Sequence, residues 1–424
     1  MTTNTEVAAF RGVHPLIEKE EAEKLLLPGY AMDEHFPKRG ATCGRDHLDY
    51  YFKVIWPLIC AYRSVIVGQR AMTTYSLLGM FAVGDRDLDH ISAGHVFLIA
   101  DPGTGKTLLA SVPKKVLRAK ATRIQGTADL LPSDYTGGHI LQINPETGQK
   151  FFEFIPGPAF GEIQLFDEIS RTSPRMQAAT LQVLCEGTIT VAGKTYAANP
   201  FMIMTGNELE SEGTHKPADA LMDRVMFQVR ATPFTIADRI EIIRRTDKFR
   251  QIKLEAIADY SMVNEAREFF HNNVVISPEI EEFIARLSDS LNKADQLGLF
   301  ADLRQKFDFG DDEEILNPRA AIIEGRGMLH MTGAAKAIAG VLRFRNYVTL
   351  ADVQKVLLPV IRHRTRFMPG AIEDFREKMR KDLALRFGGK AGRTEMHEYL
   401  LGELARLAWA HVLLDMGRSR HVGN

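Results

Sequence analysis

The sequence is poor in cysteine and carries almost no net charge. Its 424 residues include three cysteines, and the formal net charge is −1. So few cysteines form no disulfide framework, and their scarcity indicates a reducing compartment. Cys43, His47 and Cys60 are of the residue types that bind zinc, but a fourth ligand and the paired spacing are missing. The near-neutral charge provides no bulk basic field to attract nucleic acid or acidic lipid.

Long hydrophobic runs are absent as well. No stretch approaches the roughly 18 uninterrupted apolar residues that a membrane helix needs. Residues 1–15 lack the basic start and the apolar run of a secretory signal. We therefore expect a cytoplasmic protein without a membrane segment. With 45% hydrophobic and 25% charged residues the chain can bury an ordinary core, and its length predicts two or three domains.

Between Val65 and Val229 short apolar runs alternate with helical patterns. The apolar runs are Val96–Ala100, Gln164–Phe166, Phe201–Thr205 and Arg224–Val229, and the helical stretches include Leu108–Lys120 and Ser173–Cys185. This alternation predicts a parallel sheet covered by helices, and hence an α/β fold. After Pro233 the pattern becomes helical. The C-terminal stripe of a last predicted helix comprises Leu400, Leu404, Leu407, His411 and Leu414.

Two segments within the sheet region have the alternation and turn residues of β-hairpins. His139–Ile143 and Lys150–Ile155 flank a turn at residues 144–148, and Thr188–Ala192 and Thr195–Ala197 flank Gly193-Lys194. Hairpins inserted into a sheet scaffold usually project from it and contact partners.

A strand, a glycine-rich turn and a helix follow one another from Val96 onward. The turn is Ala100-Asp101-Pro102-Gly103-Thr104-Gly105-Lys106-Thr107, and Leu108 continues into the helix. In this context backbone N–H groups and a helix N-terminus cradle phosphate. We expect Lys106 to reach the β and γ phosphates and the Thr107 hydroxyl to hold Mg²⁺. Ala100 replaces the first glycine of the usual pattern, which is tolerable if Ala100 has ordinary strand geometry.

Two later apolar runs also end in polar residues. Ile163–Phe166 is followed by Asp167-Glu168, and Phe201–Thr205 is followed by Gly206-Asn207. Asp167 is expected to act through the water shell of the metal, and Glu168 to polarise the attacking water. Asn207 can hydrogen-bond the γ phosphate or that water, although a turn asparagine after glycine is the simpler interpretation. The sequence thus predicts Mg²⁺-dependent ATP hydrolysis.

GTP is the alternative nucleotide. Asn292-Lys293-Ala294-Asp295 matches a guanine-reading pattern, and Asp134-Tyr135-Thr136-Gly137 matches a switch pattern. Neither follows a predicted strand, so we interpret both as accidental and prefer ATP.

Taken together, these motifs resemble the MoxR family of AAA+ ATPases. The resemblance covers roughly Val65–Arg366 and includes Val65–Gln69, Arg123–Asp134, Pro156–Pro158, Asp167–Arg171, Glu186–Thr190, Leu221–Arg224, Asn317–Ala320 and Arg362–Arg364. It implies nucleotide contacts from Val67, Gly68, Pro102, Gly103, Thr104, Gly105, Lys106, Thr107 and Leu108. Ala100, Ser170 and Val225 depart from the family pattern, but none of them removes a charged or metal-binding group.

The resemblance also implies roles for three residues and a ring. Asn207 is the expected sensor-1 residue, Arg319 the sensor-2 arginine, and Arg224 the arginine finger that reaches a neighbouring subunit in a hexamer. Arginines aimed at the γ phosphate stabilise the charge that hydrolysis spreads over it. The structural alternatives are an Asp223–Arg224 surface pair and a helix-start arginine after Pro318.

A protein client is the partner that the resemblance implies. Family members are chaperone-like ATPases, and their partners carry a von Willebrand A domain, which would lie on another chain because no Asp-x-Ser-x-Ser motif occurs here. The hairpin at His139–Ile155 resembles the helix-2 insert that lines the pore or faces substrate. Two other functions compete: an ATP-binding scaffold with negligible turnover, and a nucleic-acid motor, against which the neutral charge counts.

The predicted organisation has four segments. Residues 1–55 form an N-terminal helical extension, and residues 56–232 an AAA+ P-loop NTPase domain in which helices sandwich a parallel sheet. Residues 233–368 form an all-α lid, and residues 369–424 a C-terminal helical extension. No task can be assigned to either extension from its sequence.

Overall fold

The computed structural model describes residues 45–86, 90–100, 103–146, 148–206, 217–246, 252, 254–307, 313–317, 322–378 and 393–422. These residues form two compact units. The first runs up to Val275 and includes Lys336–Tyr347, and the second comprises Ile276–Ala335 and the residues from Val348 onward.

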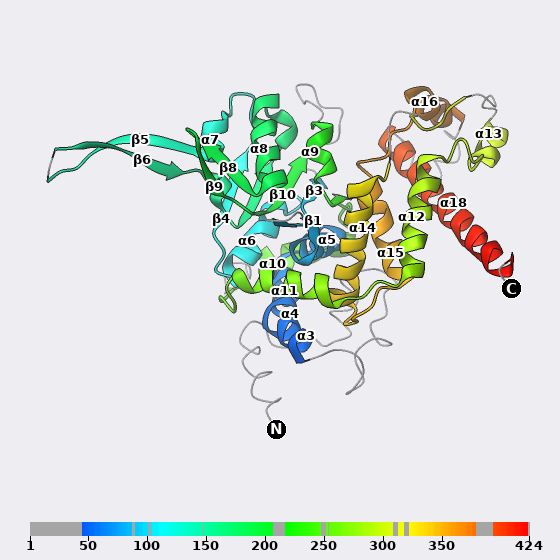
Figure 1. Ribbon diagram of the computed structural model, residues 1–424, viewed down its shortest axis with the longest axis horizontal. Coiled ribbons are helices and arrows are strands. Elements are labelled where there is room, and N and C mark those ends of the chain that lie inside the picture. The colour runs from blue at the N-terminus through cyan, green and yellow to red at the C-terminus, as the bar shows by residue number, and fades with distance from the viewer. Residues whose placement is uncertain are drawn as a thin grey trace. The chain divides into compact units, whose positions relative to one another are not determined.

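A five-stranded parallel sheet lies at the centre of the first unit (Figure 1). Its strands, in spatial order, are β11 (Phe227–Arg230), β3 (Val96–Ile99), β10 (Phe201–Gly206), β7 (Ile163–Asp167) and β4 (Ala121–Gln125). Every residue of β7 and β10 is buried, as expected for strands covered on both faces. The predicted α/β fold is confirmed. Two details differ from the prediction: strand β4 was not predicted, and Arg224 follows helix α9 (Asp219–Asp223) instead of opening β11.

Helices cover the sheet and join its strands. They are α3 (Arg45–Tyr50), η2 (Tyr51–Ile55), α4 (Trp56–Val65), α5 (Arg70–Phe81), α6 (Lys106–Val116), α7 (Pro132–Thr136), η3 (Pro158–Phe160), η4 (Ile169–Arg171), α8 (Pro174–Glu186), α9, α10 (Ile236–Thr246), α11 (Ser261–Asn273) and η6 (Ile338–Leu342). Helix α8 shows why they form where they do. The Ser173 side chain accepts a hydrogen bond from the Met176 N–H, Pro174 opens the helix, and Gly187 ends it in a left-handed conformation.

Gln164 is a polar residue inside the buried strand β7. Its side chain accepts a hydrogen bond from the Tyr135 hydroxyl (2.9 Å) and donates to the carbonyls of Ala159 (2.6 Å) and Gly161 (3.2 Å). Because a buried amide is tolerated only when it is hydrogen-bonded, these contacts explain the break in the apolar run.

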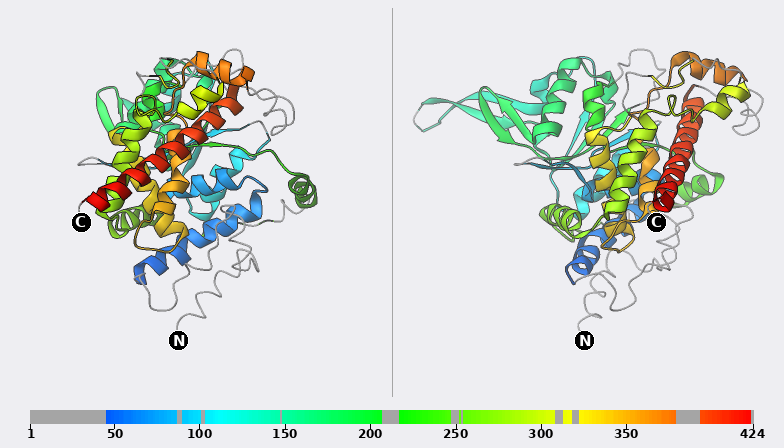
Figure 2. Two further views of the ribbon diagram at one scale, coloured as in Figure 1. Left: turned by 90° about the vertical axis from the view of Figure 1, so that its right-hand side faces the viewer. Right: turned by 45° about the vertical axis from the view of Figure 1, so that its right-hand side comes forward.

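Three antiparallel strand pairs accompany the main sheet in the part of the chain that the structure describes. Both predicted ones are confirmed, as β5 (Gly137–Ile143) with β6 (Lys150–Pro156), and β8 (Thr188–Val191) with β9 (Lys194–Ala197). The β5–β6 hairpin extends away from the sheet as a long arm, which Figure 1 and the right-hand view of Figure 2 show. A third pair, β1 (Val83–Arg86) with β2 (Ile91–Ala93), was not predicted. No helix among the described residues is long and apolar enough to cross a membrane.

The second unit is helical. Its helices are α12 (Pro278–Asn292), α13 (Ala301–Phe307), α14 (Gly325–Ala337, whose last two residues belong to the first unit), α15 (Leu350–Ile361), α16 (Pro369–Lys378) and α18 (Arg393–Val422). The predicted stripe on α18 is wrong at its C-terminal end. Leu400 and Leu404 are buried, but burial continues through Ala408 and Val412, while Leu414 is 63% exposed. The buried face follows a four-residue step because α18 packs against α12.

The two GTP-type patterns have structural roles. Asn292 ends α12, donates to the Ile323 carbonyl (2.8 Å) and accepts from the Ile322 N–H (2.6 Å). The Asp295 carboxylate accepts from the Leu316 N–H (2.6 Å), and the Asp134 side chain accepts from the Leu131 N–H at the start of α7 (2.9 Å). These side chains form hydrogen bonds within the fold, which agrees with our interpretation of both patterns as accidental.

Candidate functional site

The glycine-rich turn connects β3 to α6. Gly103 and Gly105 adopt left-handed conformations, with φ of +83° and +91°, which side chains other than glycine rarely adopt. Gly105 is the N-cap of α6, so the positive end of the helix lies at the loop. The Leu108 N–H donates to the Gly105 carbonyl (3.0 Å). Asp101 and Pro102, which complete the predicted loop, lie outside the described residues.

Ala100, which replaces the first glycine of the usual loop pattern, does not need the backbone freedom of glycine. It is not among the described residues with positive φ, so the missing glycine is not needed for backbone freedom. The residue is buried, and its carbonyl accepts a hydrogen bond from the Lys106 ammonium (3.0 Å).

Lys106 points from the start of α6 toward the end of β7. The residue is buried, and its Nζ lies 3.9 Å from the Asp167 carboxylate. Thr107 and Leu108, the next two residues of the first helical turn, are exposed. A buried ammonium beside the N-terminus of a helix forms a compact positive site.

Asp167 ends β7 in a network of donors. The Thr205 hydroxyl donates to its Oδ1 (2.6 Å) and the Arg123 guanidinium to its Oδ2 (2.8 Å). Burial opposes ionisation, but these hydrogen bonds and the charges of Lys106 and Arg123 outweigh it and hold the pKa of Asp167 below its usual value. Asp167 is therefore a carboxylate at neutral pH.

Glu168 follows in a strained conformation. Its φ is +56°, in the left-handed region that few residues other than glycine adopt. The Glu168 N–H donates to the Thr205 hydroxyl (2.9 Å), while its carboxylate accepts from the Gln125 amide (3.1 Å) and pairs with Arg171 (3.2 Å). Both carboxylates thus contact β4: Asp167 accepts from Arg123 and Glu168 accepts from Gln125.

Strand order brings the predicted polar positions to one edge. Strand β10 pairs in parallel with both β3 and β7, so the carboxyl ends of these three strands are adjacent. Gly206 ends β10 beside the Phe97 ring, where a Cβ would approach to 2.6 Å. Asn207 directly follows and lies outside the described residues, as does Arg319.

Arg224 lies at the opposite end of the sheet. It precedes β11, whose first residue Phe227 aligns with Val96, the first residue of β3. Its guanidinium pairs with Asp85 of β1 (2.8 Å) and not with Asp223, so the surface pair that the sequence offered as an alternative does not form.

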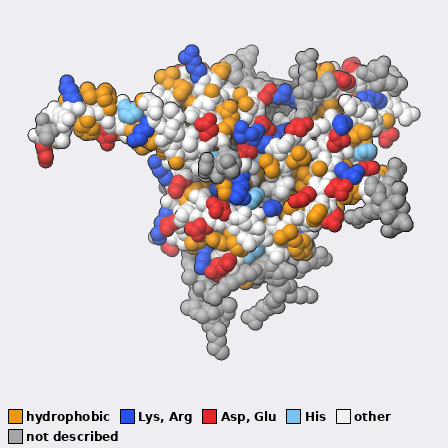
Figure 3. Space-filling model, viewed as in Figure 1, with side chains coloured by type: hydrophobic (Ala, Val, Ile, Leu, Met, Phe, Trp, Pro, Cys, Tyr) orange, Lys and Arg blue, Asp and Glu red, His pale blue; other side chains and the backbone are white. Residues whose placement is uncertain are grey.

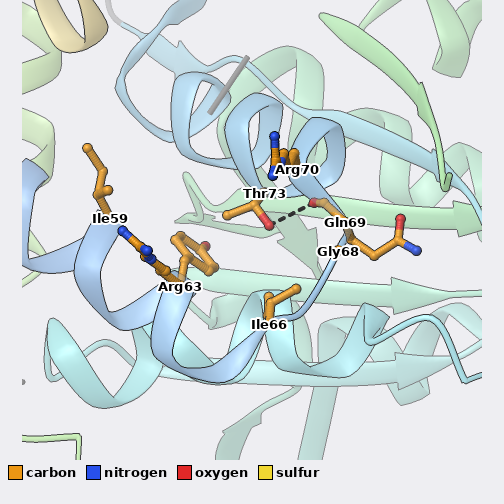
Figure 4. Close-up of a pocket in the computed structure, with 8 residues that line it drawn as sticks. Ile59, Arg63, Ile66, Gly68, Gln69, Arg70 and Thr73 are labelled. Carbon is orange, nitrogen blue, oxygen red and sulfur yellow. Dashed lines mark hydrogen bonds between the residues drawn. The ribbon is translucent and has the colours of Figure 1, made fainter. Parts of the chain in front are cut away.

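Gly68, which follows Val67, borders a small open pocket (Figure 4). Its wall comes from α4, from the segment around Gly68 and from the first turn of α5, where the Thr73 hydroxyl donates to the Gln69 carbonyl (2.9 Å). Gly68 has φ of +81°, and a Cβ there would approach the Asp238 side chain to 3.0 Å. The pocket wall is joined to the phosphate-loop helix, because the Tyr62 hydroxyl donates to the Leu109 carbonyl (3.0 Å).

Three contacts of the acid pair were missed from the sequence. They come from Arg123 and Gln125 on β4 and from Thr205 on β10. Their shared signal is position: each stands at or near the carboxyl end of a strand that neighbours β7.

A glycine-rich loop, a buried lysine and a paired acid at the carboxyl edge of a parallel sheet define a P-loop nucleotide-binding protein. A model of the ATPase family associated with various cellular activities (AAA) matches residues 95–227, and a model of the AAA lid domain matches residues 319–382.

Individual relatives agree. The chain is 33% identical over 313 residues to the uncharacterized protein YeaC of Bacillus subtilis (strain 168), covering 72% of this chain and 85% of YeaC. It is 30% identical over 325 residues to the chaperone MoxR1 of Mycobacterium tuberculosis, covering 74% and 75%. A crystal structure of a candidate ATPase from Cytophaga hutchinsonii matches with a TM-score of 0.64 and 29% identity, covering 80% of this chain and 95% of that one. This chain belongs to the MoxR family of AAA ATPases.

Proposed function

We propose that this chain hydrolyses ATP with Mg²⁺ and, as a ring, uses the energy to remodel a protein client. One observation carries the catalytic part: Lys106 and the Asp167-Glu168 pair meet at one edge of the sheet, with the ammonium 3.9 Å from the first carboxylate. The loop then binds the phosphates, Asp167 takes part in metal binding, and Glu168 activates the attacking water.

The oxygen ligands at this edge suit Mg²⁺. Magnesium binds through one or two protein oxygens and completes its shell with water and substrate phosphates. The ionised Asp167 and the exposed Thr107 at the start of α6 provide such a pair. Mg²⁺, when bound, would neutralise the charge that develops on the phosphates.

Glu168 is the proposed general base. Its carboxylate projects on a strained turn, and Gln125 and Arg171 hold it in place while it orients water against the γ phosphate. Asn207 and Arg319 are proposed to contact the same phosphate, and Val67 and Gly68 the adenine. The connection of Tyr62 to Leu109 supports an adenine position beside the loop helix.

Arg224 is proposed to act on the nucleotide of a neighbouring subunit. Lys106 follows the carboxyl end of β3, whereas Arg224 precedes the amino end of the adjacent strand β11. Four residues of strand span roughly 10 Å, at ~3.3 Å per residue. An arginine so placed cannot reach its own phosphate site, which supports a closed ring, with a hexamer as the family expectation.

The β5–β6 arm is proposed to contact the client. Its exposed apolar side chains are Ile140, Leu141, Ile143, Phe151, Phe152 and Ile155, and Figure 3 shows hydrophobic side chains along this arm. An isolated two-stranded hairpin with apolar residues on both faces leaves surface that a partner can cover. The similarity to the chaperone MoxR1 supports a protein as that partner.

Two experiments test the proposal. Titration calorimetry with ATP and Mg²⁺ should give binding that Lys106→Ala abolishes; unchanged binding by Lys106→Ala would overturn the site. Glu168→Gln, loaded with ATP, should retain a defined protein that a matched Lys106→Ala sample does not. Recovery of the same proteins by both variants would contradict the remodelling role.

A further inference from the structure

We infer that Asp85 is a positioning residue that orients Arg224 toward the nucleotide of the neighbouring subunit. The inference rests on the proposed action of Arg224 in a ring. It assigns a task to β1–β2, the hairpin that the sequence did not reveal, and to an ion pair between two segments 139 residues apart.

The pair is close and shielded. Arg224 Nη1 lies 2.8 Å from Asp85 Oδ2, and the two side chains are 22% and 16% exposed. Among the described side chains, Asp85 is the one that forms an ion pair with Arg224. A guanidinium has five N–H donors in a rigid fork, so one nitrogen bound to Asp85 leaves other donors for a second partner.

The backbone at Arg224 is held in place by its neighbours. Its N–H donates to the Leu221 carbonyl (3.1 Å) at the end of α9, and the next two residues are completely buried. The Met226 N–H donates to the His95 carbonyl (2.9 Å), just ahead of β3. The position of the Cα is therefore set, but the long side chain still has freedom that only a partner can remove.

Asp85 is fixed in turn. Its N–H donates to the Ser92 hydroxyl (2.7 Å) across the hairpin. Gly84 sits so close to β2 that a Cβ would approach the Ala93 carbonyl to 2.5 Å. The hairpin is also joined to the core, because the Arg267 guanidinium donates to the Met80 carbonyl (2.9 Å) just before β1. A carboxylate held this firmly can orient a guanidinium.

The consequence for catalysis is pre-organisation. An arginine that contributes to another subunit's transition state must already point there, because misplacement by about 1 Å can cost a hundredfold in rate. The ion pair with Asp85 reduces the number of orientations that the Arg224 side chain can adopt. Loss of the carboxylate should therefore lower kcat for ATP and leave KM little changed, since the phosphate loop itself is untouched.

Mixed rings provide the test, with Asp85→Asn as the main variant. Alone it should show at least about a tenfold lower kcat. Asp49→Asn is the matched control and should keep wild-type kcat, because it removes a carboxylate of α3 that forms an exposed ion pair with Lys53 of η2. Asp85→Glu retains the charge and should lie between the two, which keeps the test valid if Asp85→Asn folds poorly.

Complementation then locates the defect. Glu168→Gln subunits have a dead site but an intact arginine, so mixing them with Asp85→Asn should restore phosphate release severalfold above either alone. Mixing Asp85→Asn with Arg224→Ala should restore nothing, because both lack the arginine function. No recovery with Glu168→Gln, or recovery with Arg224→Ala, would overturn the inference.

The same experiment separates this inference from the proposal beneath it. Arg224→Ala mixed with Glu168→Gln tests the ring mechanism alone. Failure of that pair overturns action between subunits, and the role of Asp85 with it. Recovery of that pair, together with a wild-type kcat for Asp85→Asn, overturns only the role of Asp85.

Discussion

At the scale of single residues, the Thr205 hydroxyl links both acids of the site. It donates to Asp167 (2.6 Å) and accepts from the Glu168 N–H (2.9 Å), and the residue is completely buried. One hydroxyl thus sets the orientation of a carboxylate and holds the strained backbone that follows it.

Valine has nearly the same shape as threonine but lacks the hydroxyl. Thr205→Val should therefore weaken both the orientation of Asp167 and the support of the Glu168 backbone. It leaves the partly buried Glu168 N–H without its acceptor, which costs about 1 kcal/mol in the free energy of unfolding. We expect ATP turnover to fall by roughly tenfold or more, because the two acids lose their alignment. Urea unfolding and phosphate release measure the two effects. Thr205→Ser keeps the hydroxyl and should stay near wild type; equal losses in both variants would argue against the hydrogen bonds as the cause.

The part of the site that could be predicted consists of residues inside contiguous sequence motifs. Lys106 and Asp167-Glu168 follow strands within recognisable motifs, and the structure brings the lysine to within 3.9 Å of Asp167. Thr205, Arg123 and Gln125 were not predictable, because they join the site through the order β10-β7-β4, which strand patterns do not specify.

At the scale of elements, the β5–β6 arm is exposed where most hairpins are covered. Leu141 and Phe152 face each other across the strands and are 54% and 71% exposed. Such a pair contributes little to folding, because little of its surface leaves water.

The double variant Leu141→Ser and Phe152→Ser should therefore change the free energy of unfolding by no more than ~0.5 kcal/mol. In the Glu168→Gln background it should lose most of the client protein retained with ATP. A serine substitution at exposed Ile243 on α10, away from the arm, serves as the control. Full client retention by the double variant would show that the arm is not the contact surface.

Element boundaries failed where tertiary packing decides them. The β1–β2 pair has strands of four and three residues with an irregular register, too short for a period-two pattern. On α18 the apolar residues continue to Leu414, and only packing against α12 shows which of them are buried. Strands β3, β7, β10 and β11 were predicted because they lie in mostly apolar runs of the sequence. The edge strand β4 was not predicted, because Ile124 is its one buried residue.

At the scale of the whole molecule, stability should depend on pH through His271. Burial, together with the positive charges of Lys336 and Arg86, lowers the pKa of His271 to about 4 from 6.5. The folded state therefore keeps this imidazole neutral, while the unfolded chain binds a proton below pH 6.5. Stability from this group is present above pH 6.5 and is lost as the pH falls toward 4.

His271→Gln should remove that dependence. Between pH 7 and pH 4.5 the wild type should lose on the order of 1–3 kcal/mol more unfolding free energy than the variant. Denaturant unfolding at several pH values measures the difference, with His139→Gln, an exposed histidine of the arm, as the comparison. Parallel pH curves for wild type and His271→Gln would contradict the assignment.

The direct measurement for the whole molecule is steady-state phosphate release by wild type and Glu168→Gln at saturating ATP and Mg²⁺, with nucleotide affinity measured alongside. If Glu168 polarises the attacking water, the variant should bind ATP as tightly as wild type and turn it over at least about a hundredfold more slowly. Equal turnover by the two proteins would contradict the catalytic site described for this chain.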